Sequence, residues 1–307
     1  MPNWIFKVFF PFMAATLSAE TDLFVKGLYW YTSETMDWAF VLSGNQNTVR
    51  NEYQTFVFDW APGFSAGVKY RKEPDGWDTQ ASYTWFQSSA SDHATGTVTP
   101  GFLAARLSLL EPFSTGKAKL SIHYNMFDWD LGSEFLATEH LMFRPAIGLK
   151  GGWINQTIFS SWTRSDLPGF TAAENLRQKF QAGGAKGGVS GQWRFGNFRA
   201  HTWSLVGLFE AAYLWGHWSI RDQFTDSFST VIDTRTTDRN FGSLVFHSFF
   251  GLGWDYRWRQ DRNRVKLNVG YEIEDWLNQC QFFTDISGSQ NNDLILQGLN
   301  GGVSVDF

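Results

Sequence analysis

A chain of 307 residues in which 18% are Phe, Trp or Tyr and only 18% are charged departs from ordinary soluble domains, where about 25% are charged. The aromatic content excludes intrinsic disorder, and a net charge of −5, from 25 basic and 30 acidic residues, argues against a nucleic-acid partner. Cys280 is the only cysteine, which excludes an intrachain disulfide.

Residues 1–19 are predicted to be a signal peptide, because Lys7 precedes a short apolar run at 8–17 and small residues lead up to Ala19. A buried N-terminal helix is the alternative interpretation. The remainder, 20–307, has no stretch of the ~18 consecutive apolar residues that a transmembrane helix needs. An exported chain of this kind is either a periplasmic protein or an outer-membrane β-barrel.

From residue 20 onward the dominant pattern is alternation with a period of two, which is typical of β-strands with one apolar and one polar face. In 265–274, for example, apolar residues alternate with Lys266, Glu272 and Glu274. The pattern predicts strands at 23–31, 63–71, 77–87, 118–130, 143–153, 186–194, 201–219, 244–258, 264–275 and 295–307. Many exceed the ~5–6 residues usual in globular proteins and suit a tilted membrane strand.

The connections between these strands alternate between long and short. The long ones lie near 32–62, 88–117, 154–185, 220–243 and 276–293, and the short ones are 72–76, 131–142, 195–200 and 259–263. A barrel with an even number of strands places every long loop on the cell surface and every short turn in the periplasm. The sequence therefore predicts an all-β fold, a transmembrane up-and-down antiparallel β-barrel of the bacterial outer membrane, with about ten strands and a range of roughly eight to fourteen.

Aromatic residues support the barrel at both ends of its strands. Trp77 and Trp85 share one face, about 20 Å apart along the membrane normal, which is close to the ~25 Å height of the apolar band. In the last strand Val303, Val305 and Phe307 alternate with polar residues, and a terminal aromatic that faces lipid resembles the assembly signal of bacterial outer-membrane barrels. Replacement of Phe307 by Asp is expected to block assembly but not export.

Four segments resemble the Legionella-type major outer-membrane proteins, which also occur in chlamydiae of environmental hosts: Phe64–Tyr70, Trp77–Phe86, Arg144–Trp153 and Leu296–Phe307. The resemblance covers most of 63–307 and leaves 32–62 unmatched. It implies a barrel described as porin-like and sometimes as an adhesin, and it provides no catalytic residue.

Patterns that suggest other chemistry are weak. Residues 63–67 fit G-x-S-x-G, but the alternation continues beyond them through Val68 and Tyr70 and no helix follows. On one strand, each of Ser121, His123 and Asn125 would lie about 6.6 Å from the next, which is too far for direct contact. These three residues are interpreted as polar lining of the lumen. No enzymatic activity is expected.

No metal site is predicted, because the six histidines lack HxxxH or HExxH spacing. Two surface loops carry carboxylates that are interpreted as solvated surface, with Ca²⁺ binding as the alternative: Asp222, Asp226, Asp233, Asp238, Asp285 and Asp293.

Charged residues of both signs alternate with apolar ones and are predicted to line the lumen: Lys69, Asp78, Arg144, Lys150, Arg194, Glu210, Asp255, Lys266, Glu272 and Glu274. A mixed-charge interior indicates either a hydrated path or a salt-bridged plug. The first hypothesis is a porin-like channel and major surface protein that allows passive diffusion of small hydrophilic solutes. The alternative is a structural or adhesive surface protein that acts through its outer loops, with a narrow or plugged lumen.

The partners expected are outer-membrane lipid, the barrel-assembly machinery, small hydrophilic solutes and, for the surface-protein alternative, a host surface. No cofactor is expected.

Overall fold

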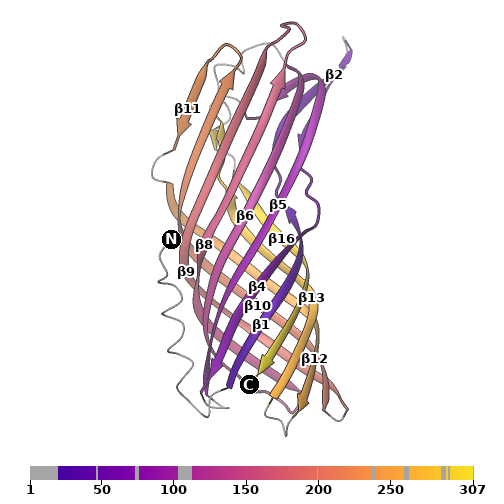
Figure 1. Ribbon diagram of the computed structural model, residues 1–307, viewed down its shortest axis with the longest axis vertical. Coiled ribbons are helices and arrows are strands. Elements are labelled where there is room, and N and C mark those ends of the chain that lie inside the picture. The colour runs from indigo at the N-terminus through magenta and orange to yellow at the C-terminus, as the bar shows by residue number, and fades with distance from the viewer. Residues whose placement is uncertain are drawn as a thin grey trace.

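The computed structural model describes residues 20–45, 48–72, 76–102, 113–198, 200–236, 239–258, 263–284, 288–289 and 291–306, and they form a tall barrel of tilted strands (Figure 1). The predicted signal peptide, 1–19, and Phe307 lie outside the described residues. No helix among the described residues is long and apolar enough to cross a membrane.

In the part of the chain that the structure describes, ten antiparallel strands form the barrel wall. In order around the wall they are β5 (Trp77–Pro100), β4 (Ala61–Arg71), β1 (Glu20–Ser33), β16 (Asn292–Asp306), β13 (Asn263–Cys280), β12 (Arg239–Trp258), β10 (His201–Asp226), β9 (Thr171–Phe198), β8 (Leu141–Thr163) and β6 (Phe113–Ser133). β6 also pairs with β5, so the sheet closes on itself. The ten predicted segments fall on these ten strands, which confirms the fold class and the strand number.

Most strands extend well beyond their predicted bounds toward one end of the barrel. β5 continues to Pro100, although the sequence placed a loop from residue 88, and β9 begins at Thr171 inside the predicted loop 154–185. We call the end toward which the strands extend the loop end, and the end with the short connections the turn end. The parts of the wall next to them are the loop half and the turn half.

The remaining strands are short and pair with the wall strands or with one another. β2 (Asp37–Asn45) and β3 (Thr48–Thr55) form a hairpin that pairs with β5 at the loop end. β11 (Val231–Arg235) pairs with β10, β7 (Phe135–Leu136) with β8, and β14 (Phe283–Thr284) with β15 (Gly288–Ser289). Parts of the predicted loops are therefore ordered sheet.

The two faces of the wall exchange polarity about halfway along the strands. In the turn half of β6, Phe127 is 51% exposed on the outside while Asp130 is buried inside. In the loop half of the same strand, Ile122 is buried inside while His123 is exposed outside. A wall surrounded by lipid needs an apolar outer face, whereas a wall surrounded by water buries its apolar face in a core.

This reversal corrects one prediction. Ser121, His123 and Asn125 lie on the outer face of β6, so the interpretation as lumen lining is wrong. The residues between them, Ile122 and Tyr124, point inward and are fully buried. Sequence alternation identified two faces correctly, but the apolar face of this segment packs into a core instead of facing lipid.

Where the two halves meet, aromatic side chains from six strands converge inside the barrel: Trp30, Phe86, Tyr124, Phe180, Trp218 and Trp276. The ring centroid of Trp30 lies 5.3 Å from that of Phe86 and 6.3 Å from that of Tyr124. Trp276 continues the row, 6.0 Å from Tyr124 and 6.1 Å from Phe180. We call these six side chains the aromatic layer; they are among the most buried in the molecule.

Candidate functional site: the barrel lumen

The ten charged residues predicted to line the lumen all occupy inward positions in the turn half: Lys69, Asp78, Arg144, Lys150, Arg194, Glu210, Asp255, Lys266, Glu272 and Glu274. Their carboxylates and most of their cations are paired with one another or with further inward charges. They form two groups, one at the turn end and one below the aromatic layer.

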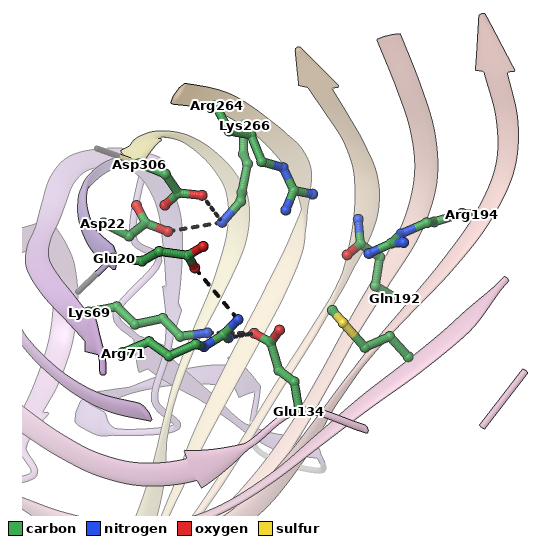
Figure 2. A pocket seen from close by; sticks show the side chains of 11 residues that line it. Glu20, Asp22, Lys69, Arg71, Glu134, Gln192, Arg194, Arg264, Lys266 and Asp306 are labelled. Atoms are coloured by element: carbon green, nitrogen blue, oxygen red, sulfur yellow. Dashed lines mark hydrogen bonds and ion pairs between the residues drawn. The ribbon is translucent and has the colours of Figure 1, made fainter. Parts of the chain in front are cut away.

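At the turn end, one side of the lumen is organised around Asp78 and Glu134. Figure 2 shows Glu134 beside Lys69 and Arg71. Asp78, which is fully buried, accepts two hydrogen bonds from Nε of Arg144 at 2.9 and 3.0 Å and lies 3.3 Å from Nζ of Lys69. Glu134 lies 2.6 Å from Lys69 and 2.5 Å from Arg71. Three cations thus share two carboxylates, which holds β4, β5, β8 and the chain after β6 together.

Figure 2 shows Lys266 between Asp22 and Asp306 on another side of this end. Its Nζ lies 3.1 Å from Asp22 and 2.9 Å from Asp306, so it joins the first and last strands of the wall. Asp255 pairs with Arg264. A cavity of about 160 Å³ lies between these charges, enough for a few water molecules.

Arg194 and Gln192 project into this cavity from β9. Gln192 donates hydrogen bonds to Ser204 and to Asp255, at 3.0 and 3.3 Å. Within the described ranges, Arg194 forms no ion pair with a carboxylate, and its Nε is buried without a hydrogen-bond partner. It is the one member of the predicted set that the structure leaves outside the pairing, again within those ranges.

Below the aromatic layer a second group of charges crosses the lumen. Lys186 lies 3.0 Å from Asp128, 2.9 Å from Asp130 and 3.6 Å from Glu210. His247 then bridges two strands, with Nδ1 3.1 Å from Glu210 and Nε2 2.6 Å from Glu272.

Glu274 ties this second group to the aromatic layer. It accepts hydrogen bonds from the Tyr124 hydroxyl at 2.8 Å and from Nε1 of Trp276 at 3.1 Å, and it lies 2.9 Å from Nζ of Lys150. The cavity among these residues is only about 70 Å³. The lumen here is polar but nearly filled.

Above the aromatic layer the chain itself enters the lumen. Residues 279–282, which we call the inserted segment, are buried inside the loop half and include Cys280 and Phe282. Gln178 on β9 donates a hydrogen bond to the Gln279 carbonyl at 2.9 Å and accepts one from the backbone N–H of Gln281 at 2.7 Å. The segment is therefore held by hydrogen bonds in the interior of the barrel.

Glu34 lies beside the inserted segment and is also buried. Nε2 of Gln156 donates to both of its carboxylate oxygens at 2.8 Å. The Cys280 thiol is a further hydrogen-bond partner of this carboxyl. Sequence reasoning missed Glu34, Gln156 and Gln178; the only available signal was their position in apolar alternation, where a polar residue interrupts a buried face.

The remaining candidates make ordinary structural contacts. Ser65 points inward and accepts a hydrogen bond from the Thr84 hydroxyl at 3.0 Å. Asp226 accepts backbone N–H groups in a turn, Asp233 pairs with Arg221, and Asp293 accepts the N–H of Asn278. Asp222 is buried in the loop half, and Asp238 and Asp285 lie outside the described residues. The described residues contain no group of three or more His, Cys, Asp or Glu side chains that could hold a metal ion.

Residues 15–307 match the model of a family described as Legionella pneumophila major outer membrane protein precursor. The chain belongs to this family. It is therefore a protein of the bacterial outer membrane. No curated protein sequence matches it.

Three solved structures resemble this family member at low sequence identity. The outer membrane protease OmpT from Escherichia coli shares 12% identity over 95% of this chain and 98% of that chain, with a TM-score of 0.41. The Pseudomonas putida toluene transporter TodX shares 9% identity over 95% and 90%, with a TM-score of 0.25. A Pseudomonas aeruginosa FadL homologue shares 8% identity over 96% and 91%, with a TM-score of 0.32.

In bacterial outer-membrane barrels the short turns face the periplasm. The turn half, with its apolar outer face, is then the part that spans the lipid. The apolar outer face ends at a ring of outward polar residues, which we call the boundary ring: Gln87, Asn125, Asn155, Gln181, His217, Asp275 and Gln297. The loop half, with its polar outer face and apolar core, stands outside the membrane.

Burial in the loop half changes the acidity of two groups of the lumen. Removal from water raises the pKa of Glu34 from 4.5 to about 7, although the hydrogen bonds from Gln156 act in the opposite direction. Burial and the neighbouring Glu34 raise the pKa of the Cys280 thiol well above its usual range. Burial therefore shifts both groups toward their neutral forms inside the barrel.

Proposed function

We propose that this family member is a surface protein of the outer membrane with a closed lumen, and that it acts through the half of the barrel that stands outside the lipid. The observation that carries the proposal is the aromatic layer. Six strands contribute to it, so the wall itself closes the lumen and not a loop alone.

Passage of a hydrophilic solute would require two costly steps. The solute would lose its hydrogen bonds to water between the rings of Trp30, Tyr124 and Trp276, which costs several kcal/mol for each uncompensated polar group. It would then have to separate the ion pairs of Lys186 and His247 below the layer. Neither obstacle is removed by withdrawal of the inserted segment.

Passive diffusion of small hydrophilic solutes is the second candidate, and one observation favours it. The cavity of about 160 Å³ at the periplasmic end is lined by charges of both signs, which suits hydrated ions. On this alternative the aromatic layer would part, and the charges below it would select the ions that pass. Neither candidate assigns a catalytic residue.

Conductance of the refolded full-length barrel in a planar lipid bilayer separates the two. The closed-lumen proposal predicts no steps above the bare bilayer in potassium chloride. Stepwise channels whose selectivity shifts toward anions in the Glu272→Gln/Glu274→Gln variant, but not in the outward control Val269→Ile, would establish the diffusion function and overturn the proposal.

A surface role predicts in addition that binding depends on the loop half. Deletion of the β2–β3 hairpin, residues 37–55, removes none of the ten wall strands and should abolish binding of the protein in vesicles to a host surface. Equal binding with and without the hairpin would assign the role to another part of the loop half.

A further inference from the structure

Basic side chains gather on one side of the barrel, on the outer face just above the boundary ring: Lys117, Lys119, His123, Arg177, Lys179 and Arg221. All six are exposed and come from β6, β9 and β10. We call them the basic patch. The face that carries them is polar and lies next to lipid. We therefore expect its ligand to be a molecule at the membrane surface.

The strand register shows how close these residues lie. His123 pairs with Asn155, which pairs with Lys179, so one row crosses three strands. In the next row outward, Thr157 pairs with Arg177, which pairs with Arg221. Neighbouring strands are about 4.8 Å apart and rows on one face about 6.6 Å, so long side chains from β6 and β9 reach a common space above β8.

The positive charge of the basic patch is hardly compensated. Arg221 pairs with Asp233, and Arg177 donates to Asn175. Among the described residues, Lys117, Lys119 and Lys179 have no ion pair. The four outward rows from His123 to Lys117 on β6, β8, β9 and β10 contain no carboxylate.

The opposite side of the wall has the other sign at this level. There, Asp275 on β13 and Asp293 on β16 point outward near each other, and the charge of Asp293 acts on Asp275. The basic patch is therefore a local feature of one side and not a belt around the barrel.

Apolar surface lies directly beneath and within the patch. Below the boundary ring, Phe127, Trp153 and Trp215 are exposed on the outside of β6, β8 and β10. Phe159, which is 50% exposed, lies between Lys119 and Asn175 inside the patch. A ligand that fits both surfaces has anionic groups at the membrane surface and hydrocarbon chains that point into the bilayer.

We propose that the basic patch binds the phosphate groups of a phosphorylated glycolipid of the outer leaflet, whose acyl chains lie against the aromatic residues below the boundary ring. The bound lipid would neutralise the lysines and fix the height of the barrel in the membrane. This site is independent of whether the lumen conducts.

Native mass spectrometry of the full-length folded barrel in a neutral detergent, titrated with diphosphorylated lipid A, tests the proposal. We expect one tightly bound lipid A in the wild type. Loss of two cations in Lys119→Gln/Lys179→Gln should weaken binding about tenfold or more. The control Arg50→Gln/Lys72→Gln removes two exposed cations that lie outside the patch, on β3 and directly after β4, and should leave binding unchanged.

Three outcomes would overturn the proposal. The first is equal affinity of the patch variant and the control variant, provided that both still show the heat-modifiable migration of a folded barrel. The second is equal binding of dephosphorylated lipid A, because the phosphates would then contribute nothing. The third is displacement of lipid A by inorganic pyrophosphate at equal concentration, which would assign the patch to a soluble phosphate compound.

Discussion

Leu267 and Asn268 are neighbours on β13, but one side chain faces lipid and the other faces the lumen. Leu267 is exposed on the outer face in the turn half, opposite Val303 of β16, whereas Asn268 points into the lumen. Arg at position 267 should destabilise the barrel by ~2–4 kcal/mol, because its charge would lie in lipid. Arg at position 268 can reach the water and carboxylates of the lumen.

The measurement is urea unfolding of Leu267→Arg and Asn268→Arg in lipid vesicles, followed by tryptophan fluorescence. Equal loss of unfolding free energy in the two variants would mean that the register of β13 is wrong.

Glu34 gives the loop half a specific pH dependence. Its pKa rises from 4.5 to about 7 on burial, so the folded barrel retains a proton that the unfolded chain has lost. Stability is therefore highest below pH 4.5, falls as the pH rises to 7, and then levels off, a total of about 3 kcal/mol from this group. In Glu34→Gln this part of the pH dependence should disappear.

Unfolding free energies at pH 5 and pH 8 measure the effect as the difference between wild type and variant. Glu52→Gln, which changes an exposed carboxylate on β3, serves as the control. The same pH dependence in wild type and Glu34→Gln would show that the carboxylate is not buried.

At the scale of single residues, sequence alternation was informative only where the solvent of each face was known. The ten charged residues from Lys69 to Glu274 occupy inward positions because the outer face of the turn half contacts lipid, which excludes charged side chains. For Ser121, His123 and Asn125 the same rule gave the wrong face, since water replaces lipid outside the loop half. The partners of each charge, such as Glu134 beside Lys69, depend on the register and could not be predicted.

At the scale of elements, the inserted segment is where the chain at the end of β13 leaves the regular wall and enters the lumen. Cys280 lies in it and is fully buried, and its thiol pKa is raised, so little of the reactive thiolate is present. A membrane-impermeant maleimide should therefore leave the folded protein unlabelled and should label it rapidly after unfolding in urea.

Ser43→Cys in a Cys280→Ser background provides the positive control, because position 43 is exposed on β2. Rapid labelling of Cys280 in the folded wild type would mean that the inserted segment leaves the lumen in solution.

The elements themselves were predictable to a limited extent. Ten strands and their antiparallel order follow from alternation and loop lengths, since the turn half must present apolar residues to lipid at every second position. The ends of β5 and β9 and the β2–β3 hairpin were missed. In the loop half the outer face is polar and the inner face apolar, as in the sheet of a soluble protein. The sequence pattern therefore does not distinguish these strands from surface loops that bury some apolar side chains.

At the scale of the whole molecule, the central feature is the exchange of polarity between the two halves. It explains why aromatic residues are both exposed, as at Trp215, and fully buried, as at Trp218, on a single strand. It also explains why the lumen holds charges below the aromatic layer and an apolar core above it.

Site-directed spin labelling along β10 tests this exchange most directly. Nitroxides are introduced at positions 213, 214, 220 and 221 in a Cys280→Ser background, and the barrel is refolded into lipid vesicles. We expect the label at 213 to collide with oxygen dissolved in the lipid and the label at 221 with a water-soluble nickel chelate, while those at the buried positions 214 and 220 collide with neither. Lipid accessibility at both 213 and 221, or chelate accessibility at 214 or 220, would contradict it.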